Sequence, residues 1–201
     1  MTARNFSRMP TFGFLLLALL LPSCSTSRIE QPDIYLVPVG GFSSALVSEL
    51  ADYYKQKFNL KVSLLPAIEL GDRVIDRNRR QVIAEELIEV IKQKHEHLAA
   101  NSRAIIIGLT SNDMYIRGVT WQFAFSFRKY GKFAVVSCAR MDPVNLGQEP
   151  DDNVLRSRLR KMVTKNVGIL YFGHSQNDNP RSVLYSQILG VEELDAVGED
   201  F

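Results

Sequence analysis

The chain holds three histidines and two cysteines, the residue types that bind zinc or supply a nucleophile and its base: His95, His97, His174, Cys24 and Cys138. His174 stands alone near the end of TKNVGILYFGHS (residues 164–175), an apolar run of helical character that turns through Gly173. Cys138 lies in KFAVVSCAR, a composition typical of a buried strand. A nucleophilic cysteine needs a base and an accessible, electropositive site. Nothing near Cys138 in the sequence supplies one, so an inert core thiol is favoured over a nucleophile that uses His174.

The other two histidines lie close together. His95 and His97 are two residues apart in KQKHEHLAA, where the pattern predicts the end of a helix. Side chains at this spacing point to different sides of a helix, so both are expected at a solvated helix end. A new metal site that combines them with His174 stays an open alternative.

The N-terminus has the pattern of an export signal. Arg4 and Arg8 form a basic head, residues 12–21 are apolar, and LPSC ends at Cys24. A membrane-spanning helix needs about 20 apolar residues, so the shorter stretch indicates a signal peptide. LPSC is similar to a bacterial lipobox, in which the cysteine becomes the lipidated N-terminus. We therefore predict a lipoprotein signal peptide at 1–23, a tether at 24–32 and one domain at 33–201, with plain secretion as the alternative.

This reading predicts a membrane-anchored lipoprotein of a bacterial cell envelope, facing the periplasm and contacting the membrane through lipid on Cys24. The chain has 24 Lys and Arg against 22 Asp and Glu, and removing residues 1–23 takes away Arg4 and Arg8, which leaves 22 of each. Without a general basic field, nucleic acid is not expected as a partner. Five cations between Arg156 and Lys165 are interpreted as a solvated helix face, with an anionic ligand or lipid headgroups as the alternative.

Apolar runs and helical periodicity alternate along the rest of the chain. In residues 120–140, Trp121, Phe123, Phe125 and Phe127 alternate with smaller side chains, so we expect a hairpin with this aromatic row in the core. The alternation predicts an α/β fold, either a three-layer sandwich or a mixed sheet covered by helices. Strands are expected at 33–40, 60–66 and 103–110, and helices at 43–58, 77–99 and from 153 onward.

Several strings in this order resemble one family. They are IYLVPVG, RRQVIAEEL, IIIGLTSNDMYI, FAFSFRKYGKFAVVSCARM and SVLYSQILGVEELD. Over residues 34–195 the chain resembles the archaemetzincins, which are zinc-dependent metallopeptidases. The resemblance implies a single α/β domain of the zincin, metzincin-like type, with a mixed twisted sheet covered by helices and the active-site motif on the last long helix.

The signature of that family is HExxHxxGxxHC. Two histidines four apart on a helix and a third after a glycine turn bind one Zn²⁺, and the glutamate is the general base. On TKNVGILYFGHS these positions are taken by Thr164, Lys165, Gly168, Tyr171, His174 and Ser175. The resemblance thus implies that Thr164 and Gly168 replace two ligands, that Lys165 replaces the base, and that His174 is the one retained ligand position. Leu184 takes the place of the Met-turn methionine and keeps its apolar bulk.

The degenerate motif implies an inactive homologue of a zinc metallopeptidase, without catalytic residues, a complete set of metal ligands or a cofactor. We expect such a protein to act as a binding or structural module, with an extended peptide or protein segment in the former substrate cleft. The alternative is a zinc-dependent metallopeptidase of this family whose non-standard ligands come from His95, His97, Asp and Glu.

Overall fold

The computed structural model of the protein describes Met1 and residues 34–201. The expected signal peptide at 1–23, the lipidation site Cys24 and the tether at 24–32 lie outside these residues, so they stay predictions. Among the described helices, none has the length and apolar character that crossing a membrane requires.

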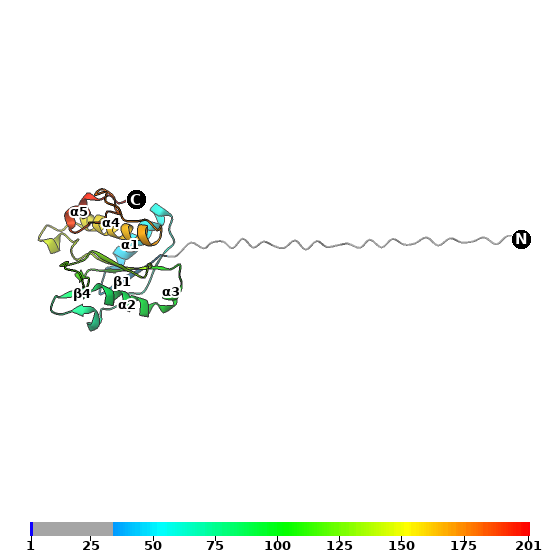
Figure 1. Cartoon of the computed structure of the whole chain (residues 1–201), viewed down its shortest axis with the longest axis horizontal. Coiled ribbons are helices and arrows are strands. Elements are labelled where there is room, and N and C mark those ends of the chain that lie inside the picture. The colour runs from blue at the N-terminus through cyan, green and yellow to red at the C-terminus, as the bar shows by residue number, and fades with distance from the viewer. Residues whose placement is uncertain (2–33) are drawn as a thin grey trace. The chain divides into compact units, whose positions relative to one another are not determined.

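A five-stranded sheet forms the centre of the domain (Figure 1). Its order is β2-β1-β5-β8-β7, and β7 is the antiparallel edge strand beside four parallel strands. The central strands are continuous apolar runs, as expected for strands that are covered on both faces. The bounds are Ile34–Val39 for β1, Val62–Leu64 for β2, Ile105–Thr110 for β5, Ser126–Lys129 for β7 and Phe133–Ser137 for β8.

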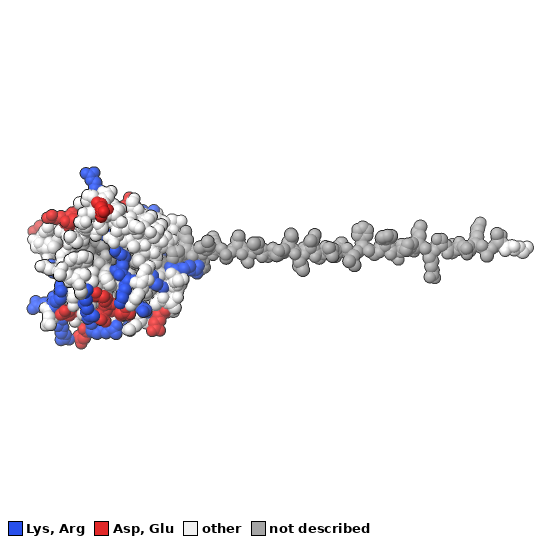
Figure 2. Space-filling view, in the orientation of Figure 1, with Lys and Arg blue, Asp and Glu red and all other residues white. Residues whose placement is uncertain are grey.

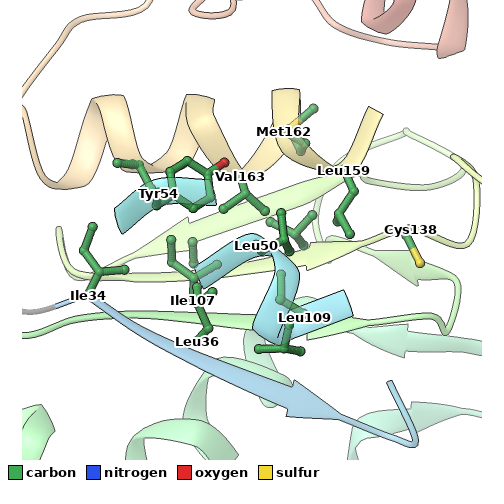
Figure 3. Packing of buried hydrophobic residues seen from close by; sticks show 14 of the residues in the cluster. Ile34, Leu36, Leu50, Tyr54, Ile107, Leu109, Cys138, Leu159, Met162 and Val163 are labelled. Atoms are coloured by element: carbon green, nitrogen blue, oxygen red, sulfur yellow. The ribbon is translucent and has the colours of Figure 1, made fainter. Parts of the chain in front are cut away.

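Helices cover both faces of this sheet (Figure 1). On one face lie α1 (Ser44–Phe58), α4 (Asp152–Leu170) and α5 (Val191–Ala196), and on the other lie α2 (Ala84–Lys94) and α3 (Glu96–Ala100). Each layer buries its own hydrophobic cluster against the sheet. Figure 3 shows the first cluster, in which Leu50 of α1 and Leu159 of α4 face Leu109 of β5. The predicted α/β fold, a mixed sheet covered by helices, is confirmed.

A second, three-stranded sheet has the order β3-β4-β6. Its strands are Ile75–Asp76, Gln81–Ile83 and Met114–Tyr115, and short 3₁₀ turns lie at Asp72–Val74 (η1) and Val144–Leu146 (η2). This sheet corrects the helix expected at 77–99, because β4 pairs with both neighbours and the helix begins only at Ala84. The same helix ends at Lys94, and α3 follows as a separate turn.

The aromatic row of the hairpin is only partly in the core. Phe125 is buried on the α4 side of the sheet, whereas Phe127 packs in the cluster on the α2 side. A bend at Phe125 breaks the strict alternation that the sequence pattern assumes. Trp121 lies before this bend and is 53% exposed, so its expected place in the core is wrong.

Charged side chains of both signs are intermixed on the face of the domain that Figure 2 shows. That described face therefore carries no extended field of one sign. Single cations matter where they are buried, and two of them lie in the cleft described next.

Candidate functional site

A cleft opens beside the edge strand β7, under α4 and against a wall formed by residues 186–189. The cavity has a volume of about 510 Å³. Its lining consists of residues 121–126 and Arg128 on the strand side, Met162 and Lys165 from α4, and Gln176 with residues 186–189 on the far side.

Lys165 is the charged group that α4 places in this cleft, at the position of the signature's glutamate. Only 5% of the residue is exposed, and its ammonium donates a hydrogen bond to the backbone carbonyl of Tyr185. Burial, and after it the positive charge of Arg128, lower the pKa of Lys165 to about 8. A lysine with this pKa is still mostly protonated at neutral pH, so the cleft holds a cation where the signature has an acid.

Arg128 is the second cation of the cleft and comes from β7. Its guanidinium donates to Asn166 Oδ1 at 3.0 Å and to Gln176 Oε1 at 3.2 Å, and burial lowers its pKa. The amide nitrogen of Asn166 donates to the Met162 carbonyl at 2.7 Å, which turns the amide oxygen toward the arginine. The ion pairs between described residues include neither Arg128 nor Lys165. Both cations therefore have neutral partners.

Three further cations of α4 differ from this pair. Arg156, Arg158 and Arg160 bind the carboxylates of Glu49, Asp195 and Glu199, respectively. Arg158 is 5% exposed and donates through Nε and Nη2 to both oxygens of Asp195. The solvated face expected from the sequence is thus wrong for Arg158, which anchors α5 to α4, and for Lys165, which is equally buried.

Thr164 occupies the first ligand position and is fully buried against α1. Its hydroxyl lies 2.9 Å from the Tyr54 hydroxyl, which donates to the Arg160 carbonyl at 3.0 Å. Because the one phenolic proton is used in that bond, the threonine hydroxyl is the donor to Tyr54. Figure 3 shows the Tyr54 hydroxyl directed at α4.

Gly168 occupies the second ligand position and is packed closely. A Cβ at this residue would lie 2.4 Å from Phe201 Cε1 and 3.0 Å from Leu184 Cδ2. The helix ends after Leu170, and Gly173 adopts a positive φ of 70° that turns the chain. This turn brings the His174 amide to the Gly168 carbonyl, with an N–O distance of 2.9 Å.

His174 lies beside Gly168, as the motif alignment requires, and its side chain belongs to an aromatic cluster. The imidazole stacks on Phe172 with ring centroids 5.8 Å apart and meets Phe201 edge-on at 5.0 Å. The residue is exposed. Leu184 approaches Gly168 from below, so the structure brings together the second and third motif positions and the Met-turn position.

The other candidate residues lie apart from this group. His95 caps α2, and His97 belongs to α3, in the layer across the sheet from α4. His95 is buried and burial lowers its pKa, so its expected solvated position is wrong, whereas His97 is exposed. Cys138 is a buried free thiol whose pKa burial raises to about 11, as expected for an inert core cysteine.

Three residues of the site were missed from the sequence: Arg128, Tyr54 and Phe201. Arg128 has a signal in hindsight, because it stands on a strand among aromatic and small residues where a cation is costly. Tyr54 and Phe201 carry no such signal, since each contacts α4 from a distant segment of the chain.

Comparisons with known proteins identify a family and relatives of this chain. A sequence model described as peptidase family M54 matches residues 38–195. The archaemetzincin of Pyrococcus horikoshii is 30% identical over 145 residues, which cover 71% of this chain and 73% of the relative. The archaemetzincin of Pyrococcus furiosus is 25% identical over 160 residues, 76% of this chain and 79% of the relative.

Solved structures share the fold. The archaemetzincin of Archaeoglobus fulgidus, complexed with malonate, gives a TM-score of 0.67 at 23% identity, over 84% of this chain and 94% of that one. A structure described as a zinc-dependent peptidase from Methanocorpusculum labreanum gives a TM-score of 0.68 at 22% identity, over 84% and 95% of the two chains.

These relatives contradict two predictions made from the sequence. The expectation of no cofactor is wrong, because relatives that include a zinc-dependent peptidase point to zinc. The expected location in a bacterial cell envelope is also wrong, because the relatives are archaeal archaemetzincins and the N-terminal segment lies outside the described residues.

The residues at the aligned ligand positions do not fit a zinc ion. Thr164 is used in the bond with Tyr54, Gly168 has no side chain, and Lys165, the next residue after Thr164, is a buried cation. Zinc takes three protein ligands in catalytic sites, and His174 alone supplies one. Within the described part of the chain, no group of three His, Cys, Asp or Glu side chains could hold a metal ion.

Three findings identify the family of this chain: the matched family model, the sequence identity to archaemetzincins and the fold shared with solved structures. This chain belongs to peptidase family M54, the family of the archaemetzincins.

Proposed function

We propose that this family member is a peptide-binding module whose cleft receives an extended segment of a partner chain beside β7. The observation that carries the proposal is the open cleft of about 510 Å³ along the edge strand of the central sheet. A protein that binds peptides through backbone groups keeps this capacity when the residues at the ligand positions change.

The backbone of β7 supports this mode of binding. The Ser137 amide donates to the Phe125 carbonyl, and Ser126 and Arg128 are aligned with Val136 and Ala134 of β8. In an antiparallel pair, residues that bond to the neighbouring strand alternate with residues that do not. The N–H and C=O groups of Ser126 and Arg128 therefore point away from β8, to the edge where a further strand would pair.

The rim of the cleft supports it as well. Trp121 is 53% exposed and Leu189 is 61% exposed, and both line the cavity. Phe123 also lines the cavity and packs against the core cluster, with its ring 5.1 Å from that of Phe125. Exposed apolar side chains at the rim of an open cleft are typical of binding surfaces.

A second candidate function is favoured by the relatives: a zinc-dependent peptidase. The family match and the similarity to a structure described as a zinc-dependent peptidase support it. It requires ligands other than those at the aligned positions. The discriminating observation is cleavage of a bound peptide that depends on added zinc and stops with a chelator.

The test uses Trp121, the one tryptophan of the chain, as a fluorescent reporter at the rim. A capped peptide of alternating valine and threonine is titrated into the full chain, and saturable change of the Trp121 signal is the expected result. Ser126→Pro removes an edge N–H without removing a bond to β8 and is expected to weaken binding strongly. The matched control Ser126→Ala keeps the N–H and should bind like the parent.

Two results would count against the proposal. Equal affinity of Ser126→Pro and Ser126→Ala, with unchanged melting of both, would show that the edge is not used. Zinc-dependent products in mass spectra of the same mixtures would favour the peptidase instead.

A further inference from the structure

The two cations of the cleft repel each other, and no carboxylate of the described residues forms an ion pair with either of them. Lys165 and Arg128 line the same cavity, and the charge of Arg128 is one cause of the lowered pKa of Lys165. Their hydrogen bonds go to a backbone carbonyl and to two side-chain amides. Neutral acceptors orient the two groups but do not cancel their charges.

Burying like charges without a counter-ion is unfavourable, and a carboxylate placed between them would offset this cost. Arg156, Arg158 and Arg160 on the same helix already have carboxylate partners within the chain. Lys161 donates to two backbone carbonyls, and its charge acts on the Asp195 carboxylate. The cleft is therefore the place beside α4 where a carboxylate from outside would meet two cations that lack one. Charge-assisted bonds to both an ammonium and a guanidinium would hold it.

We propose that the cleft selects peptides with an acidic side chain, Asp or Glu, whose carboxylate binds between Arg128 and Lys165. This inference rests on the proposed function, because it needs a peptide strand at the edge of β7. It adds the chemical class of the ligand, which the edge strand alone does not determine.

Cross-strand geometry favours an acidic side chain over a C-terminal carboxylate as the group that binds the two cations. In a sheet, a residue directly opposite Arg128 on an added strand points its side chain to the same face as Arg128. For Arg128 that face is the α4 side, because its guanidinium reaches Asn166. Lys165 lies one residue before Asn166 and lines the same cavity. An acidic side chain at this register thus meets both cations while the peptide backbone continues in both directions.

The experiment compares three peptides by Trp121 fluorescence. The first is capped and carries one central glutamate among alternating valine and threonine. The second replaces the glutamate by glutamine, and the third is the glutamine peptide with a free C-terminal carboxylate. We expect the glutamate peptide to bind at least about tenfold more tightly than both others, as for close charge pairs across an interface.

Variants locate the effect. Lys165→Met and Arg128→Gln are each expected to reduce the glutamate preference toward one, and Lys165→Glu to reverse it. The matched control is Lys161→Met, because the Lys161 ammonium also donates to backbone carbonyls, those of Leu194 and Asp195, but does not line the cavity. Its glutamate preference should equal that of the parent. Arg128 is half-buried at a sheet edge, so Arg128→Gln keeps the test valid if Lys165→Met does not fold.

The outcomes separate this inference from the proposed function. Equal binding of the glutamate and glutamine peptides would overturn the acidic preference and leave peptide binding intact. Tight binding of the free-carboxylate peptide alone would assign the site to a chain terminus and overturn the side-chain inference. Absence of binding by all three peptides would overturn both.

Discussion

Phe201 packs against Gly168 so closely that a methyl group at Gly168 would lie 2.4 Å from the phenylalanine ring. The ring also contacts His174 and Phe172, with centroid distances of 5.0 and 5.2 Å. The position that carries a zinc-binding histidine in the family signature thus carries a glycine that admits an aromatic ring. The two residues are expected to depend on each other energetically.

Gly168→Ala should reveal this dependence. Alanine is better than glycine inside a helix by about 1 kcal/mol, but here its Cβ must displace the Phe201 ring. We therefore expect Gly168→Ala in the otherwise unchanged chain to leave the free energy of unfolding the same or to lower it by up to about 1 kcal/mol. In a Phe201→Ala background the same change should stabilise the protein. Urea unfolding of the parent, the two single variants and the double variant measures this coupling, and the same effect of Gly168→Ala in both backgrounds would contradict it.

The Tyr54–Thr164 pair should stabilise the packing of α1 on α4. Tyr54→Phe leaves the buried Thr164 hydroxyl and the Arg160 carbonyl without this partner, which we expect to cost about 1–3 kcal/mol. Thr164→Val in the Tyr54→Phe background removes the stranded hydroxyl and should recover part of the loss. The measurement is the urea midpoint of each variant. Simple additivity of the two single changes would show that the hydroxyls do not interact.

The pKa of Lys165 predicts a pH dependence of stability. Its folded value of about 8 lies below the ordinary value of 10.5. Between these values the unfolded chain holds a proton that the folded chain has released, so the free energy of unfolding rises with pH across this window. Cys138, whose pKa is raised to about 11, acts in the opposite direction above about pH 9, so the rise is measured as the difference between the parent and Lys165→Met, which carries the other titrating groups unchanged. A constant difference between parent and variant from about pH 7 to 10.5 would show that Lys165 titrates normally.

The regular part of the fold was predictable because it depends on local pattern. The apolar runs of β1 and β5 and the helical spacing in α1 correctly indicate a sheet with helices on it. The start of α2 was not predictable from the sequence, because residues 81–83 satisfy a helical pattern locally but pair with β6 in the folded chain. Pairing between distant segments overrides local propensity there.

The motif positions of the site were predictable, whereas their surroundings were not. His174 and Gly168 meet because a helix and a glycine turn impose that geometry within one segment. The groups that act on Lys165 come from other parts of the chain. Arg128 of the hairpin lowers its pKa, and the Tyr185 carbonyl, in the loop after α4, accepts its hydrogen bond. Sequence alone could name the lysine but not the second cation beside it.

The last prediction concerns rebuilding the ligand set of the family signature. Thr164→His and Gly168→His would join His174 in a three-histidine set, which is the donor set for zinc, and Lys165→Glu would restore the general base. The packing of Gly168 shows that a histidine there collides with Phe201, so the three changes should succeed only together with Phe201→Ala. We expect this variant to bind zinc more tightly than Phe201→Ala alone in competition with a chromogenic chelator. Adding His174→Ala should remove the gain, because it takes away the third ligand. Equal zinc affinity with and without the rebuilt residues would show that the backbone of α4 and its following turn no longer hold the family's ligand geometry.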